Sequence, residues 1–344
     1  MSARVLISIV TYNSARHLEA CLESLRQQTY RNSRIAVWDN ASTDETRSIL
    51  ERQRDFICSI HFSDRNVGFC AAHNRLIVSA ECDYVLVLNP DVYLTPLFLE
   101  KMIGWMERDP SAGSATGKLY RNRDGRILDT AGIYFTPSQR HLDRGSNEVD
   151  MGQYETAEYV FGASGAAALY KRVMLDEIRD GREFFDESFF AYREDADLAW
   201  RAQWMGWRCL YIPEAVGYHA RRVLPANRSA LPGSINMHSF KNRFLLRIKN
   251  MDSGTYARFL LPITLRDAAA LLYVLLREWS SLPAIPRLIA ACPRAWARRK
   301  SIRSRRRASP REIRSWFSYK PVARRIQDSK LEIRNQVPPA KPQA

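Results

Sequence analysis

The chain has 344 residues, of which 46% are hydrophobic and 26% charged, with a formal net charge of +15. This length allows one sizeable core with a smaller appendage, and the composition excludes a disordered chain or one wholly embedded in a membrane. Residues 281–344 hold 17 Lys or Arg against three Asp or Glu, so almost all of the excess charge lies in the tail. We therefore expect the tail and the nearly neutral remainder to bind different partners.

The first third of the chain alternates short apolar runs with amphipathic segments. Residues 5–10 (VLISIV) form a continuous apolar run, which is typical of a strand buried on both faces. Strands that alternate with helices predict βαβ units and a mainly parallel, doubly wound sheet. The predicted strands are residues 5–10, 34–38, 59–62 and 84–88, and the predicted helices cover 18–25, 42–54, 69–79 and 96–108.

Polar residues follow these strands at the edge of the sheet where ligands bind in such folds. Asp91 stands just beyond the fourth strand, and one or two carboxylates with phosphate oxygens suffice to hold a divalent cation on a diphosphate. The alternative for Asn89-Pro-Asp91 is an ordinary turn. Asp39 could accept a hydrogen bond from a base or a ribose, whereas residues 42–45 (STDE) predict a capping box that starts a helix.

Further along, mixed strands and loops are expected at 112–120, 127–135 and 158–170. A helix over 194–205 follows, and a strand over 207–212. An aromatic run leads into Glu194, Asp195 and Asp197 at the start of that helix. The helix dipole alone favours acidic residues there, but a carboxylate behind a water-excluding strip could also act as a general base. His219 is either a structural histidine or an imidazole ligand for the same metal.

Taken together, these segments resemble the inverting family 2 glycosyltransferases with the GT-A fold. The nearest likeness is to rhamnosyltransferases of bacterial cell-surface polysaccharide synthesis. The resemblance spans residues 5–219. Matching elements are the first-strand motif at residues 10–13, the nucleotide loop at 38–44, Asn66 to Phe69 with Asn74, the metal motif at 89–91, the acidic pair Glu194-Asp195, and His219.

The resemblance implies a fold and a reaction. The fold is α/β, a GT-A type doubly wound, mainly parallel sheet with helices on both faces, plus a C-terminal helical basic extension. The reaction is inverting transfer of a single sugar, with rhamnose from dTDP-rhamnose the first donor to test, onto a hydroxyl of a lipid-linked glycan. The implied roles are Asp195 and Glu194 in catalysis, Asp91 and His219 on Mg²⁺ or Mn²⁺, and Thr11, Tyr12, Asn13, Asp39, Asn66 and Asn89 on the nucleotide sugar.

Two departures from the family pattern stand out. Asn89 replaces the first carboxylate of the metal motif, so Asp91 and His219 would have to hold the metal together with the diphosphate. The Q-x-x-R-W motif of polymerising members is missing, which favours single-sugar addition. The alternative function is a catalytically inactive, basic adaptor for a membrane or for nucleic acid.

We predict a catalytic domain at 1–222 and a helical, basic, membrane-associating region at 223–344. The apolar run at 268–276 is shorter than the ~20 residues of a spanning helix. Residues 279–316 mix Leu, Ile and Trp with many arginines, which favours a helix lying on an anionic lipid surface over one that binds nucleic acid. The expected location is cytoplasmic, peripheral on the inner membrane. The oligomeric state stays open.

The cysteines also favour a cytoplasmic location. They are scattered, with no C-x-x-C pair, and nothing at the N-terminus resembles a signal peptide. We therefore expect reduced core thiols in a cytoplasmic protein. The six are Cys21, Cys58, Cys70, Cys82, Cys209 and Cys292.

Overall fold

The computed structural model describes residues 2–121, 125–221 and 233–318. The predicted domain boundary after residue 222 and the proline-rich end at 337–344 lie outside the described residues.

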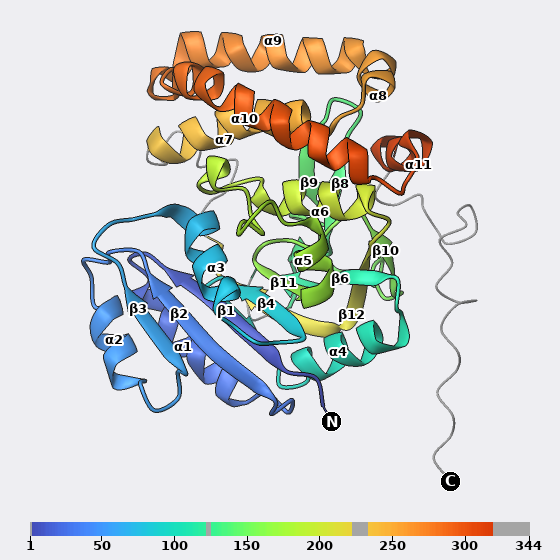
Figure 1. Cartoon of the computed structure of the whole chain (residues 1–344). Helices are drawn as coiled ribbons and strands as arrows, with labels where there is room; N and C mark the ends of the chain where they lie inside the picture. Colours follow the sequence, from blue (N-terminus) through green and yellow to red (C-terminus); the bar gives the residue numbers. More distant parts are fainter. Residues whose placement is uncertain (1, 122–124, 222–232, 319–344) are drawn as a thin grey trace.

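The centre of the molecule is a ten-stranded mixed sheet with the order β10-β12-β6-β11-β4-β1-β2-β3, in which β5 pairs with β12 and β7 with β6 (Figure 1). Strands β4, β1, β2 and β3 are parallel. The apolar residues of β1 and β4 are buried on both faces of the sheet. The predicted fold class is confirmed. The parallel strands are β1 (Val5–Thr11), β2 (Ser33–Asp39), β3 (Ser59–Phe62) and β4 (Tyr84–Leu88).

Helices cover both faces of this parallel half. Right-handed crossovers place α1 and α2 on one face, where they contact each other, and α3 on the other, where it packs against β1 and β2 (Figure 1). Each helix turns its apolar side to the sheet; in α1, Leu18, Cys21, Leu22 and Leu25 are buried. The helices of this half are α1 (Ala15–Arg26), α2 (Thr46–Arg52) and α3 (Gly68–Val78), whereas α4 (Phe98–Arg108) packs against the other half of the sheet.

The predicted start of the second helix at Ser42 is wrong. Helix α2 begins at Thr46, whose backbone N–H donates to the Asp44 carboxylate at 3.1 Å. The Ser42 backbone N–H donates to Asp39 Oδ2 at 3.1 Å and its hydroxyl donates to Asp39 Oδ1. The serine is thus committed to the carboxylate at the end of β2 and cannot cap a helix.

The second half of the sheet is mixed. Strand β11 (Ala167–Lys171) runs antiparallel to both β4 and β6 (Ala112–Tyr120), and β12 (Arg208–His219) runs parallel to β6. Strands β8 and β9 form a separate hairpin. The remaining strands are β5 (Val92–Leu94), β7 (Leu128–Thr130), β8 (Ile133–Phe135), β9 (His141–Asp143) and β10 (Glu158–Val160).

The predicted end of the last strand near Ile212 is also wrong, because β12 continues to His219. The pairing of β12 with β6 shifts between Ile212 and Val216, which marks an irregularity within the strand. Gly117 of β6 accommodates it, since a Cβ atom there would lie 2.2 Å from the Ala215 carbonyl oxygen. The continuation carries His219 to the edge where Asp91 stands.

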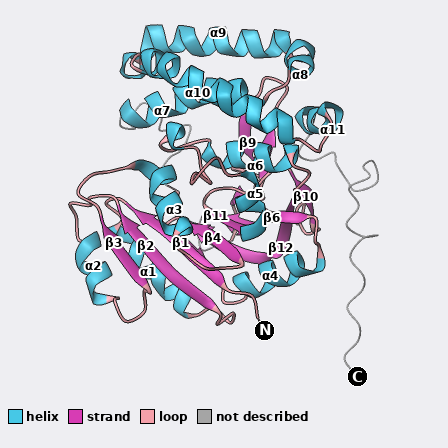
Figure 2. Cartoon of the chain, viewed as in Figure 1, coloured by secondary structure: helices cyan, strands magenta, loops and turns pink. Residues whose placement is uncertain are grey.

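The C-terminal part is a layer of helices that packs over α6, with α9 outermost (Figures 1 and 2). It shares the main core: Leu245, Leu246, Ile302 and Phe317 belong to the same buried cluster as the strands. None of the described helices is both long and apolar enough to cross a membrane. The helices from α5 on are α5 (Arg172–Ile178), α6 (Glu194–Trp204), α7 (Gly233–Asn250), α8 (Ser253–Arg258), α9 (Leu260–Arg277), α10 (Ala284–Arg305) and α11 (Pro310–Ser315), with short 3₁₀ turns at Glu187–Phe189, Trp279–Ser281 and Trp316–Ser318.

Two smaller expectations need correction. All six cysteines are free, but Cys58 is exposed and Cys292 is partly exposed, so these two are not core thiols. The basic run of α10 does not point wholly outward either. Arg298 and Arg299 are buried, and Arg298 donates to Asp180 at 2.7 Å and to Glu183 at 2.6 Å in the segment that follows α5.

Candidate active site

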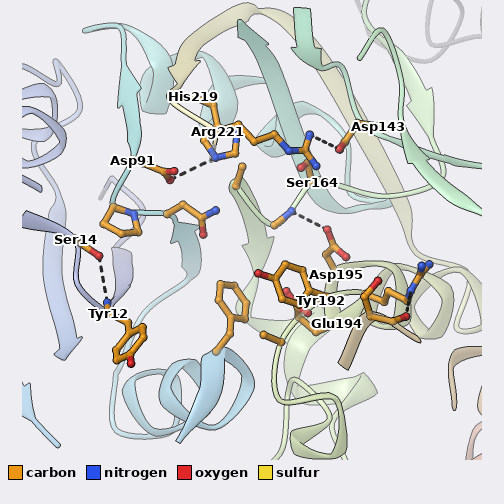
Figure 3. Close-up of a pocket in the computed structure, with 18 of the residues that line it drawn as sticks. Tyr12, Ser14, Asp91, Asp143, Ser164, Tyr192, Glu194, Asp195, His219 and Arg221 are labelled. Carbon is orange, nitrogen blue, oxygen red and sulfur yellow. Dashed lines mark hydrogen bonds and ion pairs between the residues drawn. The ribbon is translucent and has the colours of Figure 1, made fainter. Parts of the chain in front are cut away.

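A cleft of about 430 Å³ opens at the carboxyl ends of β1 and β4 and extends to the first turn of α6. Asp91 and His219 lie at one side of it and Asp195 with Glu194 at the other (Figure 3). The cleft therefore brings together residues that are more than 100 positions apart in the sequence. Of the predicted site residues, its lining includes Tyr12, Asn89, Asp91, Glu194, Asp195 and His219.

Thr11 and Asp39 lie behind this lining. The Thr11 hydroxyl donates to Asp39 Oδ1 at 2.9 Å, and Arg47 Nε donates to Asp39 Oδ2 at 3.1 Å. Both Thr11 and Asp39 are fully buried. The carboxylate thus holds together the loops that follow β1 and β2, and its predicted contact with a nucleoside stays a prediction.

Asn13 and Asn66 shape turns at the same edge. Asn13 has a φ of 50°, a conformation that asparagine tolerates better than most residues, and its Oδ1 accepts from the Thr43 backbone N–H at 2.8 Å. Asn66 Oδ1 accepts from the backbone N–H of Gly68 at 2.9 Å, just before α3. Neither lines the cleft, so their predicted part in donor binding also stays a prediction.

His219 lies between two carboxylates. Its Nδ1 is 2.7 Å from Asp129 Oδ2, and its Nε2 is 3.4 Å from Asp91 Oδ1. Burial alone would lower the pKa of His219, but the hydrogen bonds and charges of Asp129 and Asp91 raise it to about 9. Burial opposes ionisation of Asp91 as well, yet the same histidine holds the pKa of Asp91 below its usual value.

This arrangement fits a divalent cation. Two ligands that each lie about 2.1 Å from one octahedral ion are about 3 Å apart, close to the observed separation of Asp91 Oδ1 and His219 Nε2. Asp129 on the other ring nitrogen is the supporting partner that metal-binding histidines commonly have. Among the described residues no group of three or more His, Cys, Asp or Glu could hold a metal, so a diphosphate and water would have to complete the coordination.

Asp195 is oriented by backbone groups. Its Oδ2 accepts from the Gly165 N–H at 3.1 Å, and its Oδ1 accepts from the Ala196 N–H at 2.7 Å. Burial raises the pKa of Asp195 above its usual value, which strengthens it as a base. A Cβ atom at Gly165 would lie 3.4 Å from the Asp195 carboxylate, which is an ordinary van der Waals contact, so this approach does not require glycine.

Glu194 differs sharply from its neighbour. Its side chain is buried, and its Oε2 has no hydrogen-bond partner in the described part of the chain. Burial, followed by the negative charge of Asp195, raises the pKa of Glu194 to about 8. At neutral pH Glu194 is thus mainly protonated, and Asp195 is the carboxylate available to accept a proton.

The loop before α6 has an unusual backbone. Phe190, Tyr192 and Arg193 have φ values of 65°, 71° and 72°, and such left-handed positions are costly for residues other than glycine. Asn242 of α7 holds this loop: its Nδ2 lies 2.8 Å from the Tyr192 carbonyl oxygen and 2.9 Å from that of Ala191. The C-terminal region therefore takes part in shaping the segment that leads into α6.

Sequence reasoning missed several residues that line the cleft or contact its lining. Asp129, Asp143 and Arg221 come from segments without a recognisable motif; Arg221 Nη1 donates to Asp143 Oδ2 at 2.8 Å beside the cleft. Asp197 is fully buried outside the cleft, where Lys249 donates to it at 2.7 Å and Arg201 at 2.9 Å. Only the pairing of Arg201 with Asp197 at helical spacing could have been seen in the sequence.

The comparisons with known proteins establish the family of the chain. The profile of glycosyl transferase family 2 matches residues 6–179, just over half of the chain. The chain belongs to glycosyl transferase family 2. It is 29% identical over 237 residues, 61% of this chain and 74% of the relative, to an N-acetylglucosaminyl-diphospho-decaprenol L-rhamnosyltransferase of Mycobacterium tuberculosis. This family 2 glycosyltransferase is thus related to rhamnosyltransferases.

Solved structures share the fold. A complex of the mannosyltransferase PcManGT from Pyrobaculum calidifontis with GDP-Man and Mn²⁺ matches with a TM-score of 0.52 at 20% identity, over 92% of this chain and 84% of that one. TarS 1-349 of S. aureus with UDP-GlcNAc matches with a TM-score of 0.55 at 16% identity, over 91% and 90%. At these identities the likeness shows the GT-A fold alone.

Proposed function

We propose that this glycosyltransferase is an inverting enzyme that moves one sugar from a nucleotide diphosphate to an acceptor hydroxyl, with Asp195 as the base. The observation that carries the proposal is the single cleft that holds Asp91 and His219 opposite the Asp195 carboxylate. The acceptor oxygen attacks the anomeric carbon as the bond to the diphosphate breaks on the opposite side, so the configuration inverts. Asp195 takes the proton that the hydroxyl loses.

Asp91 and His219 would hold Mg²⁺ or Mn²⁺, in line with the Mn²⁺ bound by the mannosyltransferase of similar fold. The cation would supply positive charge against the diphosphate that departs. Asp129 would keep the imidazole of His219 in position. Tyr12, whose side chain is 54% exposed at the cleft, and Asn89 are placed to contact the donor.

The donor is the first point to test. We expect dTDP, the nucleotide of dTDP-rhamnose, to bind in calorimetry with micromolar affinity in the presence of Mn²⁺ and much more weakly without it. Asp91→Ala should lose most of the metal dependence. UDP is the comparison nucleotide, and binding of neither would refute the proposed donor site.

The base is tested with Asp195→Asn. This variant should keep its nucleotide affinity within about twofold and lose at least 10²-fold in turnover, because only proton removal is affected. Glu194→Gln is the matched neighbour and should keep most of its turnover, since Glu194 is already protonated at neutral pH. Equal activity of Asp195→Asn and wild type would assign the base to another residue.

We further propose that the acceptor is a lipid-linked glycan and that the enzyme docks on the cytoplasmic face of the inner membrane through α9. The rhamnosyltransferase relative, by its name, acts on a decaprenol-linked substrate. On the outer face of α9, Leu261, Leu265, Leu272 and Leu276 recur at helical spacing and are 70%, 63%, 56% and 64% exposed. Such an apolar stripe is typical of a helix that lies in a lipid interface.

Flotation with anionic vesicles tests this docking. The wild-type chain should float in physiological salt, and Leu265→Glu with Leu272→Glu should abolish flotation. Val173→Glu is the control, because Val173 is an exposed apolar residue of α5 away from the stripe. A double variant that floats as well as wild type would refute the stripe as the membrane contact. In this proposal residues 223–344 form the membrane-associating region.

A further inference from the structure

A second cavity, of about 660 Å³, lies next to the catalytic cleft. Its lining residues come from the β8–β9 hairpin, α7 and α9. The two cavities share lining residues, so the second is a continuation of the first toward α9. The shared residues are His141, Asp143, Arg193, Arg221 and Ser239.

The lining of this second cavity is strongly basic. It contains five arginines and a single acidic residue, Asp143, which already pairs with Arg221. Burial, followed by the positive charges of Arg193, Arg221 and Arg140, holds the pKa of His141 well below its usual range, so His141 is neutral. The arginines are Arg140, Arg193, Arg221, Arg243 and Arg266.

Helix α9 presents two different faces. Its outer side carries the exposed leucine stripe, while Arg266, Ala270 and Tyr273 line the basic cavity on its inner side. A molecule with a phosphate head and an apolar chain could place the head among the arginines and its chain along α9. Arginine is suited to this role because its planar guanidinium binds phosphate oxygens in pairs.

We propose that the basic cavity binds the diphosphate of a polyprenyl-linked acceptor and so presents the attached sugar to Asp195. The inference rests on the proposed transfer to a lipid-linked acceptor and assigns it a binding site. The shared lining places the diphosphate beside the catalytic cleft, so that the first sugar beyond it reaches the base.

Farnesyl diphosphate is a short, soluble probe for this site. Calorimetry would use the full chain with dTDP and Mn²⁺ present, so that the donor site is already occupied. We expect wild type to bind the probe, and Arg140→Gln with Arg266→Gln to bind it at least tenfold more weakly. The single variant Arg140→Gln, on an exposed part of the hairpin, should show a smaller loss without risk to folding. Arg277→Gln, at the exposed end of α9, is the matched control and should bind like wild type.

The outcomes separate this inference from the proposed function. If dTDP binds but farnesyl diphosphate does not, or if all variants bind the probe equally, the inference is overturned while the donor site stands. If dTDP itself fails to bind, the proposed function is refuted, and the inference that rests on it is refuted as well. Phosphatidylglycerol in mixed micelles is the competing source of phosphate. If it displaces the probe at equal concentration, the cavity is a headgroup site and the acceptor assignment is overturned.

Discussion

Glu194 and Asp195 are neighbours in the chain but lie in different surroundings. Asp195 accepts hydrogen bonds from two backbone N–H groups. Glu194 is buried, and burial, followed by the negative charge of Asp195, raises its pKa to about 8. Both residues line the cleft, but Glu194 is mainly protonated at neutral pH, whereas the two backbone hydrogen bonds to Asp195 favour the charged form of its carboxylate.

The buried Glu194 makes stability depend on pH. The folded protein holds this proton more tightly than the unfolded chain, whose ordinary pKa is 4.5, so stability falls as the pH rises from about 4.5 to about 8. Glu194→Gln should therefore raise the free energy of unfolding at pH 9 by on the order of 2 kcal/mol and change it little at pH 5. Urea denaturation at the two pH values measures this. Glu45→Gln, an exposed position, is the control; an equal effect of Glu194→Gln at both pH values would contradict the pKa.

At the scale of elements, the strained loop before α6 depends on α7. Asn242 is fully buried and lies within hydrogen-bond distance of the carbonyl oxygens of Phe189, Ala191 and Tyr192. On the other side of the loop, Gly68 at the start of α3 has a φ of +86°, and a Cβ atom there would lie 2.6 Å from the Phe190 ring. The loop is thus held between α3 and the C-terminal region.

Asn242→Leu preserves size but removes these hydrogen bonds. We expect a loss of about 1–3 kcal/mol in the free energy of unfolding, because buried carbonyl groups lose their partner. Turnover should fall at least tenfold as the loop and the start of α6 relax, with nucleotide affinity nearly unchanged. Ser234→Ala, at an exposed position of the same helix, serves as the control. Wild-type turnover in a folded Asn242→Leu protein would show that the loop does not depend on this contact.

The elements also show what the sequence could and could not reveal. The third and fourth strands have the predicted bounds. The run YVLVL of the fourth strand is fully buried in the middle of the sheet, whereas the third strand is a partly exposed edge strand. The start of α2 and the length of β12 could not be predicted. Ser42 donates its hydrogen bonds to Asp39 instead of capping the helix. Strand β12 continues past an irregularity that depends on Gly117 of β6, a neighbouring strand that is far away in the sequence. Asp91, Asp195 and His219 could be found from motifs, whereas Asp129 and Asn242 became visible only through tertiary contacts.

At the scale of the whole molecule, the C-terminal helices and the catalytic part form one core. Lys249 is buried and donates to Asp186 at 2.9 Å and to Asp197 at 2.7 Å, and Asn250 donates to Asp197 Oδ1 at 2.8 Å. Arg298 of α10 pairs with Asp186 from the other side. These contacts join α7 and α10 to α6, the helix that carries Asp195.

Lys249→Met tests whether the C-terminal helices and the rest of the chain unfold together. Asp186 and Asp197 would each keep an arginine but lose the ammonium group that links them, so we expect a loss of about 3 kcal/mol in the free energy of unfolding. Tryptophan fluorescence and far-UV circular dichroism should report one coincident urea transition in wild type and variant. The exposed Lys300→Met should be neutral. Two separate transitions in wild type would mean that the C-terminal helices fold independently.

The junction between α6 and α7 also bears on engineering. One way to change the acceptor specificity would be to replace the C-terminal helices with those of another family member. Such a graft would leave Asp186 and Asp197 without Lys249 and the 189–192 loop without Asn242. A transplanted piece that preserves these contacts must therefore include residues 180–201 together with the helices.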